Sequence, residues 1–452
     1  MRVYRGHLIH IGGTPALDGA RHHLVNIPDG ALVVGEGGTI VFSGAYAALP
    51  FEAADADVQD FRPSYLLPGF IDTHLHFPQT YCLDSFGGGQ LLDWLQRCIF
   101  PAEVRLSDPE HALAAARDFC DRRIAVGTTT ALVFGSAFPP AQDALYESSQ
   151  QSGLRTISGR GIQTVGPAAA QPLLTDDATA IELTRREIER WHGTQDGLIQ
   201  VAVIPRFALS VTERSLLAIG EFYESVRADG VYFHTHLSEN VSEIQAVKAS
   251  FNVDHYLDTY DGRCAGGGRS LLGRRSVLAH AVHCSDRELS RLAETGSSIA
   301  HCPTSQLFLG SGTMPWRRTT SSGVNVALGT DVAAGDEWLI PRVLNDCFKV
   351  HISEPGSQGL SIPPAQLLFT ATLAGARALD IEDRVGNLDT GKEADFVVIT
   401  SQRQPLLSEL LAEIDPQDGE RVLFTLLMGM REVAVEQTYV RGRRLVTRTR
   451  EG

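Results

Sequence analysis

Runs of apolar residues alternate with amphipathic segments through the middle of the chain. Eight runs have the length of a β-strand and little polar alternation, which is typical of strands covered on both faces. They lie at 66–72, 128–134, 155–161, 199–206, 231–236, 276–280, 297–301 and 324–330. Helix-like segments lie between them, among others at 111–126, 177–191, 212–228 and 286–295. This alternation predicts an α/β fold with a parallel sheet.

Eight strand–helix units favour a closed (β/α)8 TIM barrel, whose active site would lie at the carboxyl ends of its strands. A doubly wound open sheet is the structural alternative. The two ends of the chain instead contain short strand-like runs, so we expect them to pair into one small composite β-sandwich domain. The predicted division is 1–65 for the N-terminal part of that domain, 66–388 for the barrel and 389–452 for the C-terminal part.

Composition narrows the class of protein. The 452 residues are 43% hydrophobic, as in ordinary globular proteins. No leader-like start and no stretch of about 18 apolar residues is found, so we expect a cytoplasmic protein without a membrane partner. The net charge of −15 repels nucleic acid and favours a small-molecule substrate. Seven cysteines without a Cys-x-x-Cys pair argue against a disulfide framework or a zinc knuckle.

Histidines and a carboxylate follow the predicted strands. His74 and His76 are two residues apart, so in a strand they project from the same face. His236 follows the fifth strand and Asp331 the eighth, at the same expected rim. Three imidazoles and one carboxylate can hold a divalent ion and leave a position for water, whose pKa the ion lowers. His234 could take the place of His236 as a ligand.

Three residues at this rim are candidates for catalysis. Glu239 lies three residues beyond His236 and can carry a proton between water and a substrate nitrogen. Asp331 could accept the proton of the attacking water in addition to binding the ion. His280, after the sixth strand, could polarise the water or the developing negative charge. Zinc suits this ligand set best, and iron is the alternative.

Longer stretches match known motifs. The broader ones are Pro68-Gly-Phe-Ile-Asp-Thr-His-Leu-His76, His234-Thr-His-Leu-Ser-Glu239, Ala279-His280, Leu328-Gly-Thr-Asp331 and Gly391-Lys-Glu-Ala-Asp-Phe396. The narrower ones are Gln79, Gly88-Gly-Gln-Leu-Leu-Asp-Trp-Leu95, Phe100-Pro-Ala-Glu103, Gly127-Thr-Thr-Thr130, Pro205-Arg-Phe207, Cys302-Pro-Thr-Ser305 and Leu309-Gly-Ser-Gly312. On these motifs the chain resembles the amidohydrolase superfamily and, within it, the guanine deaminases.

The resemblance implies a metal-dependent barrel, usually homodimeric, that hydrolyses guanine to xanthine and ammonia. It also implies that Gln79, Arg206 and Phe207 contact the purine. An amide, a guanidinium and an aromatic face suit a planar base that carries an O6 acceptor and ring N–H donors. Binuclear members of the superfamily bridge two metals through a lysine. Because no lysine precedes Lys248, we expect a single ion.

Two departures from the family pattern leave alternatives open. Residues 162–167 replace a polar loop, and Gln306 stands where the family commonly has asparagine. The substrate could therefore be a related heterocycle, such as 8-oxoguanine, a pterin or an s-triazine that is deaminated or dechlorinated. A non-catalytic interaction protein on the same fold is the alternative from another class, and the complete ligand set argues against it.

Overall fold

The computed structural model describes residues 1–53, 55–82, 91–354 and 359–448, so positions 88–90 of the motif at 88–95 lie outside the described residues. The chain forms two compact units. One comprises Met1–Asp72, Asp121–Thr130 and Trp338–Gly452, and the other comprises Thr73–Cys120 and Ala131–Glu337. The division into 1–65, 66–388 and 389–452 stays a prediction.

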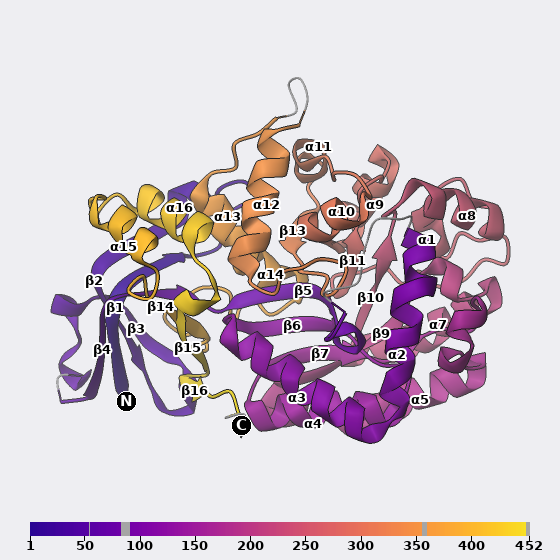
Figure 1. Cartoon of the computed structure of the whole chain (residues 1–452), viewed down its shortest axis with the longest axis horizontal. Coiled ribbons are helices and arrows are strands. Elements are labelled where there is room, and N and C mark those ends of the chain that lie inside the picture. The colour runs from indigo at the N-terminus through magenta and orange to yellow at the C-terminus, as the bar shows by residue number, and fades with distance from the viewer. Residues whose placement is uncertain (54, 83–90, 355–358, 449–452) are drawn as a thin grey trace. The chain divides into compact units, whose positions relative to one another are not determined.

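The predicted barrel is confirmed by the order of the strands (Figure 1). Eight strands neighbour one another in chain order: β5 (Phe70–His76), β6 (Thr128–Phe134), β7 (Arg155–Gly159), β9 (Ile199–Pro205), β10 (Tyr232–Leu237), β11 (Ser276–His280), β12 (Ser298–His301) and β13 (Asn325–Leu328). The short β8 (Gly161–Ile162) pairs with β9. Beyond β13, the Asp331 N–H donates to the His74 carbonyl at 2.8 Å, which brings the last strand back to the first.

The parallel register places polar residues at one end of the barrel. His236 on β10 lies opposite Ala279 on β11, and Leu237 lies opposite His280. His74 and His76 likewise lie at the carboxyl end of β5. The carboxyl ends of parallel strands therefore gather the predicted site residues at one rim.

Helices with clear start signals alternate with the barrel strands. Asp176, Thr212 and Ser285 each accept a hydrogen bond from a backbone N–H in the first turn of the helix that follows, which caps three of these helices. The helices of the barrel region are α1 (Leu91–Trp94), α2 (Phe100–Val104), α3 (Pro109–Ala125), α4 (Pro139–Ser152), α5 (Asp177–Trp191), α6 (Thr194–Gly197), α7 (Glu213–Val226), α8 (Val241–Phe251), α9 (Asp286–Thr295), α10 (Pro303–Leu309), α11 (Trp316–Ser321) and α12 (Ile340–Ile352). A π-helical turn (Leu95–Ile99) joins α1 to α2.

Both ends of the chain build a second sheet, as predicted. Its order is β16 (Arg443–Leu445), β15 (Val435–Val440), β14 (Phe396–Ile399), β4 (Asp57–Pro68), β1 (Arg2–Ile11), β2 (Leu24–Val34) and β3 (Ile40–Ala45). In Figure 1 the indigo strands of the N-terminus accordingly lie beside the yellow and orange strands of the C-terminus. Tyr4, Phe396 and Tyr439 pack together on one face, with the last two rings stacked at 4.3 Å.

Two boundaries differ from those expected. The apolar run at 66–72 is shared between two sheets, because Leu66 of β4 pairs with Val398 of β14 and the barrel strand β5 starts only at Phe70. The sequence pattern at 363–379 predicts one continuous helix, but the structure interrupts it at Thr372, whose φ of −135° and ψ of −83° separate α13 (Pro364–Ala371) from α14 (Leu373–Ala378). Two further helices, α15 (Pro405–Ala412) and α16 (Gly419–Gly429), belong to the unit that contains both chain ends.

Within the described residues, no helix combines the length and the apolar character needed to cross a bilayer.

Candidate active site

Four side chains predicted as metal ligands meet at the rim of the barrel. One ligand atom from each of His74, His76, His236 and Asp331 lies within 4.8 Å of the others. Asp331 Oδ1 is 3.1 Å from His74 Nε2 and 3.2 Å from His76 Nε2. The Nε2 atoms of His76 and His236 are 3.3 Å apart. Strands β5 and β10 and the turn after β13 thus supply one cluster, although the ligand roles themselves stay predictions.

His234 lies beside this cluster and fixes the tautomer of His74. Burial, followed by the field of His74, holds the pKa of His234 well below its usual value, so its ring is neutral. Its Nδ1–H donates to the Val277 carbonyl at 2.8 Å, and its Nε2 therefore accepts from His74 Nδ1–H at 2.8 Å. His74 Nε2 keeps a lone pair on the side of Asp331. Both ring nitrogens of His234 are thus engaged, and His234 lies outside the ligand group.

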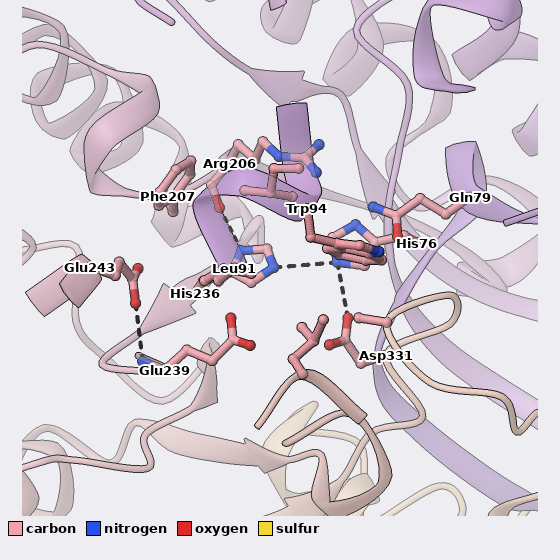
Figure 2. A pocket seen from close by; sticks show the side chains of 13 residues that line it. His76, Gln79, Leu91, Trp94, Arg206, Phe207, His236, Glu239, Glu243 and Asp331 are labelled. Atoms are coloured by element: carbon pink, nitrogen blue, oxygen red, sulfur yellow. Dashed lines mark hydrogen bonds and ion pairs between the residues drawn. The ribbon is translucent and has the colours of Figure 1, made fainter. Parts of the chain in front are cut away.

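His236 is oriented in a similar way by a main-chain oxygen. Its Nδ1–H donates to the Arg206 carbonyl at 2.6 Å, which leaves the Nε2 lone pair facing His76 (Figure 2). Lone pairs of His74 and His236 and a carboxylate oxygen of Asp331 therefore converge on one point. Buried lone pairs repel one another unless a cation lies between them. This donor set fits a divalent metal ion.

An aromatic ring lies against the imidazoles. Phe134, the last residue of β6, has its ring centroid 4.7 Å from those of His76 and His236 and 4.9 Å from that of His234. The apolar ring excludes water from this side of the cluster. Electrostatic interactions in the site are strengthened as a result.

Glu239, the predicted proton carrier, is buried beside the cluster. Its side chain accepts a hydrogen bond from Ser311 Oγ at 3.1 Å, and its Oε2 lies 3.5 Å from His280 Nε2. Burial, followed by the negative charges of Asp331 and Glu243, raises the pKa of Glu239 well above its usual value. A raised pKa favours the protonated form, so this carboxyl group is suited to carrying a proton.

His280 lies between the two carboxylates. Its Nε2 is 3.5 Å from Glu239 and 3.8 Å from Asp331 Oδ2. The residue ends β11 with a φ of +72°, in the left-handed region that non-glycine residues rarely adopt. Burial lowers the pKa of His280 to about 3, so the ring is neutral and can either donate or accept a hydrogen bond.

Two serines that we had not predicted hold the carboxylates in place. Ser305 Oγ on α10 donates to Asp331 Oδ2 at 2.6 Å, and Ser311 binds Glu239. Both belong to the motifs at 302–305 and 309–312, which supported the resemblance without indicating a role. Membership of those motifs was the signal that could have identified them.

The residues implied to bind the purine line one pocket beside the cluster. Gln79, Arg206 and Phe207 line it together with Leu91 and Trp94 of α1, and Figure 2 shows Arg206 above His236 and Gln79 beside His76. The pocket encloses about 400 Å³ that no protein atom fills, open to solvent in part.

Glu103 is a further residue that the motifs contained but that we had not singled out. It is 4% exposed, accepts from Arg206 Nη1 at 2.6 and 2.7 Å, and accepts from Gln79 Nε2 at 3.1 Å. One buried carboxylate therefore contacts two of the three side chains implied to bind the purine.

The departures from the family pattern have different locations. Gln163, Gly166 and Pro167 line a second pocket, which shares Leu95 and Phe207 with the first. The altered segment at 162–167 thus adjoins a wall of the pocket. Gln306 on α10 is buried, 2% exposed, and does not line the first pocket.

Known proteins that match nearly the whole chain include guanine deaminases and a probable guanine deaminase. A guanine deaminase of Escherichia coli is 34% identical over 419 residues, which cover 92% of this chain and 91% of the relative. A probable guanine deaminase of Deinococcus radiodurans is 39% identical over 450 residues, which cover 98% of both. The solved structure of an E. coli guanine deaminase superposes with a TM-score of 0.89 at 32% identity, covering 99% of each chain.

The match to a family description extends over most of the chain and includes every residue of the site. Residues 65–445 match the amidohydrolase family. The resemblance inferred from the motifs is confirmed, and the chain belongs to the amidohydrolase family.

Proposed function

We propose that this protein hydrolyses guanine to xanthine and ammonia. The observation that carries the proposal is the convergence of two residue sets in one pocket: the ligand cluster with Glu239, and the side chains of Gln79, Arg206 and Phe207. Relatives that match nearly the whole chain are guanine deaminases, which supports guanine over a pterin or a triazine. The complete ligand cluster argues against a non-catalytic protein.

His74, His76, His236 and Asp331 would hold one divalent ion, which when bound supplies the Lewis acid that activates water. Zinc is the ion we propose because it favours imidazole and carboxylate ligands, and iron is the alternative. A single ion is supported by the sequence, because the first lysine of the chain is Lys248.

The chain's own residues bind the base and move protons. Phe207 packs against the purine face, while Gln79 and Arg206 hydrogen-bond to its edge. Glu239 takes one proton from the attacking water, with the help of Asp331, and passes it to the ring nitrogen next to C2 as the water oxygen bonds to C2. The second proton comes from the hydroxyl group now on C2 and passes through Glu239 to the amino group, which leaves as ammonia while the C2 carbonyl of xanthine forms. His280 lies between both carboxylates and orients the water.

Replacing Glu239 tests the proposal. Glu239→Gln keeps the shape of the side chain but cannot relay a proton, so ammonia release from guanine should fall by about 10²- to 10⁴-fold. Metal content should be unchanged. Glu294→Gln, at an exposed site on α9, is the matched control and should keep wild-type turnover. Equal activity of Glu239→Gln and wild type would remove Glu239 from the mechanism, and no ammonia from guanine with wild type would remove the function.

A homodimeric state and a cytoplasmic location are part of the same proposal. The resemblance to guanine deaminases supports both. Light scattering of the purified protein gives the mass directly, and a value near the 49.0 kDa of a single chain would contradict the dimer.

A further inference from the structure

Glu103 lies on α2 and contacts residues from two other elements of the barrel. Both of its carboxylate oxygens accept from Arg206 Nη1, at 2.6 and 2.7 Å. Its Oε1 also accepts from Gln79 Nε2 at 3.1 Å. Glu103 and Arg206 are 4% and 5% exposed, so the pair is largely shielded from water. A buried guanidinium without an anion would be costly, which gives Glu103 control over the position of Arg206.

The amide of Gln79 has only one favourable orientation. Its Nε2 donates to Glu103, and its Oε1 accepts from the Ala333 N–H at 3.3 Å. A flip of the amide would place Nε2 against a donor and Oε1 against a carboxylate. Gln79 is therefore left with one N–H and one lone pair, in fixed positions, for a ligand.

Arg206 is held in a comparable way. Glu103 takes its Nη1, and the ring of Phe100 lies 5.3 Å from its guanidinium carbon. Glu103 does not engage Nη2 or Nε, and Arg206 lines the pocket, so we infer that the N–H groups on these two nitrogens are the donors offered to a ligand. Donors of this kind pair with the O6 and N7 acceptors of guanine, whereas a base with a 6-amino group presents a donor in place of O6.

We propose that Glu103 is a positioning residue that sets substrate choice. Through Arg206 and Gln79 it arranges the pocket for a purine with an oxygen at C6 and disfavours one with an amino group there. This inference deepens the proposed function and rests on it. Glu103 itself does not line the pocket.

Glu103→Gln isolates the charge. The new side chain offers one oxygen to Arg206 and turns its NH2 group toward Gln79, so Gln79 must flip and lose its bond with Ala333 or face another donor. The KM for guanine should rise about 10- to 100-fold, as expected for hydrogen bonds to a charged group, while kcat changes by less than about threefold. The preference in kcat/KM for guanine over 2,6-diaminopurine, which carries a 6-amino group, should fall about tenfold.

Glu103→Asp and Glu187→Gln complete the set. Glu103→Asp keeps the negative charge and should recover part of the preference for guanine over 2,6-diaminopurine. It tests the role of Glu103 if Glu103→Gln does not fold. Glu187 is a buried glutamate of the same unit that accepts from the Arg160 N–H at 3.2 Å and does not line the pocket. Its substitution should leave KM and the preference at wild-type values. The proposal is overturned if Glu103→Gln keeps both values, or if Glu187→Gln alters them equally.

Failure of the proposed function can be told apart from failure of this inference. Wild-type turnover of guanine tests the function, and the comparison between variants tests Glu103. Binding of xanthine, measured by calorimetry, provides the same comparison without turnover. Xanthine binding by wild type but not by Glu103→Gln supports the inference even where no ammonia is released, and equal binding by both overturns it.

Discussion

Glu243 links the backbone of Glu239, the proposed proton carrier, to the side chain of Tyr256. It lies in the first turn of α8 and is 1% exposed. Its Oε2 accepts from the N–H groups of Glu239 and Asn240 at 3.2 and 3.3 Å, and its Oε1 accepts from the Tyr256 hydroxyl at 2.7 Å. Glu243→Ala would therefore leave three buried donors without an acceptor.

The size of the effect follows from these three bonds. A buried donor left unsatisfied costs about 1–3 kcal/mol, and water entering from the pocket, which Glu243 lines, can satisfy part of the loss. We expect Glu243→Ala to lower the free energy of unfolding by about 3–5 kcal/mol. Glu243→Gln retains one oxygen and should cost about 1–2 kcal/mol, and Tyr256→Phe, which removes one donor, about 1 kcal/mol. Turnover should fall in the same order because Glu239 loses its backbone support.

Urea unfolding of the metal-loaded protein at pH 8 measures this series. Burial raises the pKa of Glu243 to about 7, so most of the group is ionised at that pH. Metal content and guanine turnover are measured on the same samples. Wild-type stability and turnover in Glu243→Ala would refute the reasoning, as would a larger loss in Tyr256→Phe than in Glu243→Ala.

Two further predictions concern pH and metal. Burial raises the pKa of Glu187 to about 8 from its ordinary value of 4.5, against the opposing effect of the Arg160 charge. The contribution of Glu187 to stability is therefore complete below pH 4.5 and is lost as pH rises through 8. Over this range the wild type should lose up to about 5 kcal/mol more stability than Glu187→Gln, and parallel unfolding curves would contradict the assignment. Chelation should abolish turnover and lower the melting temperature, and added zinc should restore both; Asp331→Ala, the control, should respond to neither treatment.

Strand periodicity and spacing were enough to predict the barrel and the residues gathered at its rim. His74 and His76 follow a two-residue period at the end of an apolar run, and the closing of eight parallel strands brings Asp331 back to them. The same period could not separate His234 from His236, because both project from one face of β10. Only the hydrogen bonds of His234 to Val277 and His74 distinguish them, and those depend on neighbouring strands.

Other features had no local signal. Glu103 binds Arg206 from α2, which follows a π-helical turn, and neither the turn nor the direction of the side chain is encoded in a hydrophobic period. The apolar run at 66–72 passes from one sheet to another at Gly69 without a change in composition. A Cβ at Gly69 would lie 2.2 Å from Thr129 Oγ1, so the close approach of two strands, invisible in the sequence, requires glycine there.

Arg206 contributes to two tasks through different atoms. Its guanidinium binds Glu103, whereas its carbonyl oxygen accepts from His236. A substitution at position 206 replaces the guanidinium but keeps the main-chain carbonyl, because every amino acid carries one. Val277 holds His234 by the same kind of atom. Substrate range can therefore drift during evolution, one residue at a time, while the imidazole geometry is inherited unchanged.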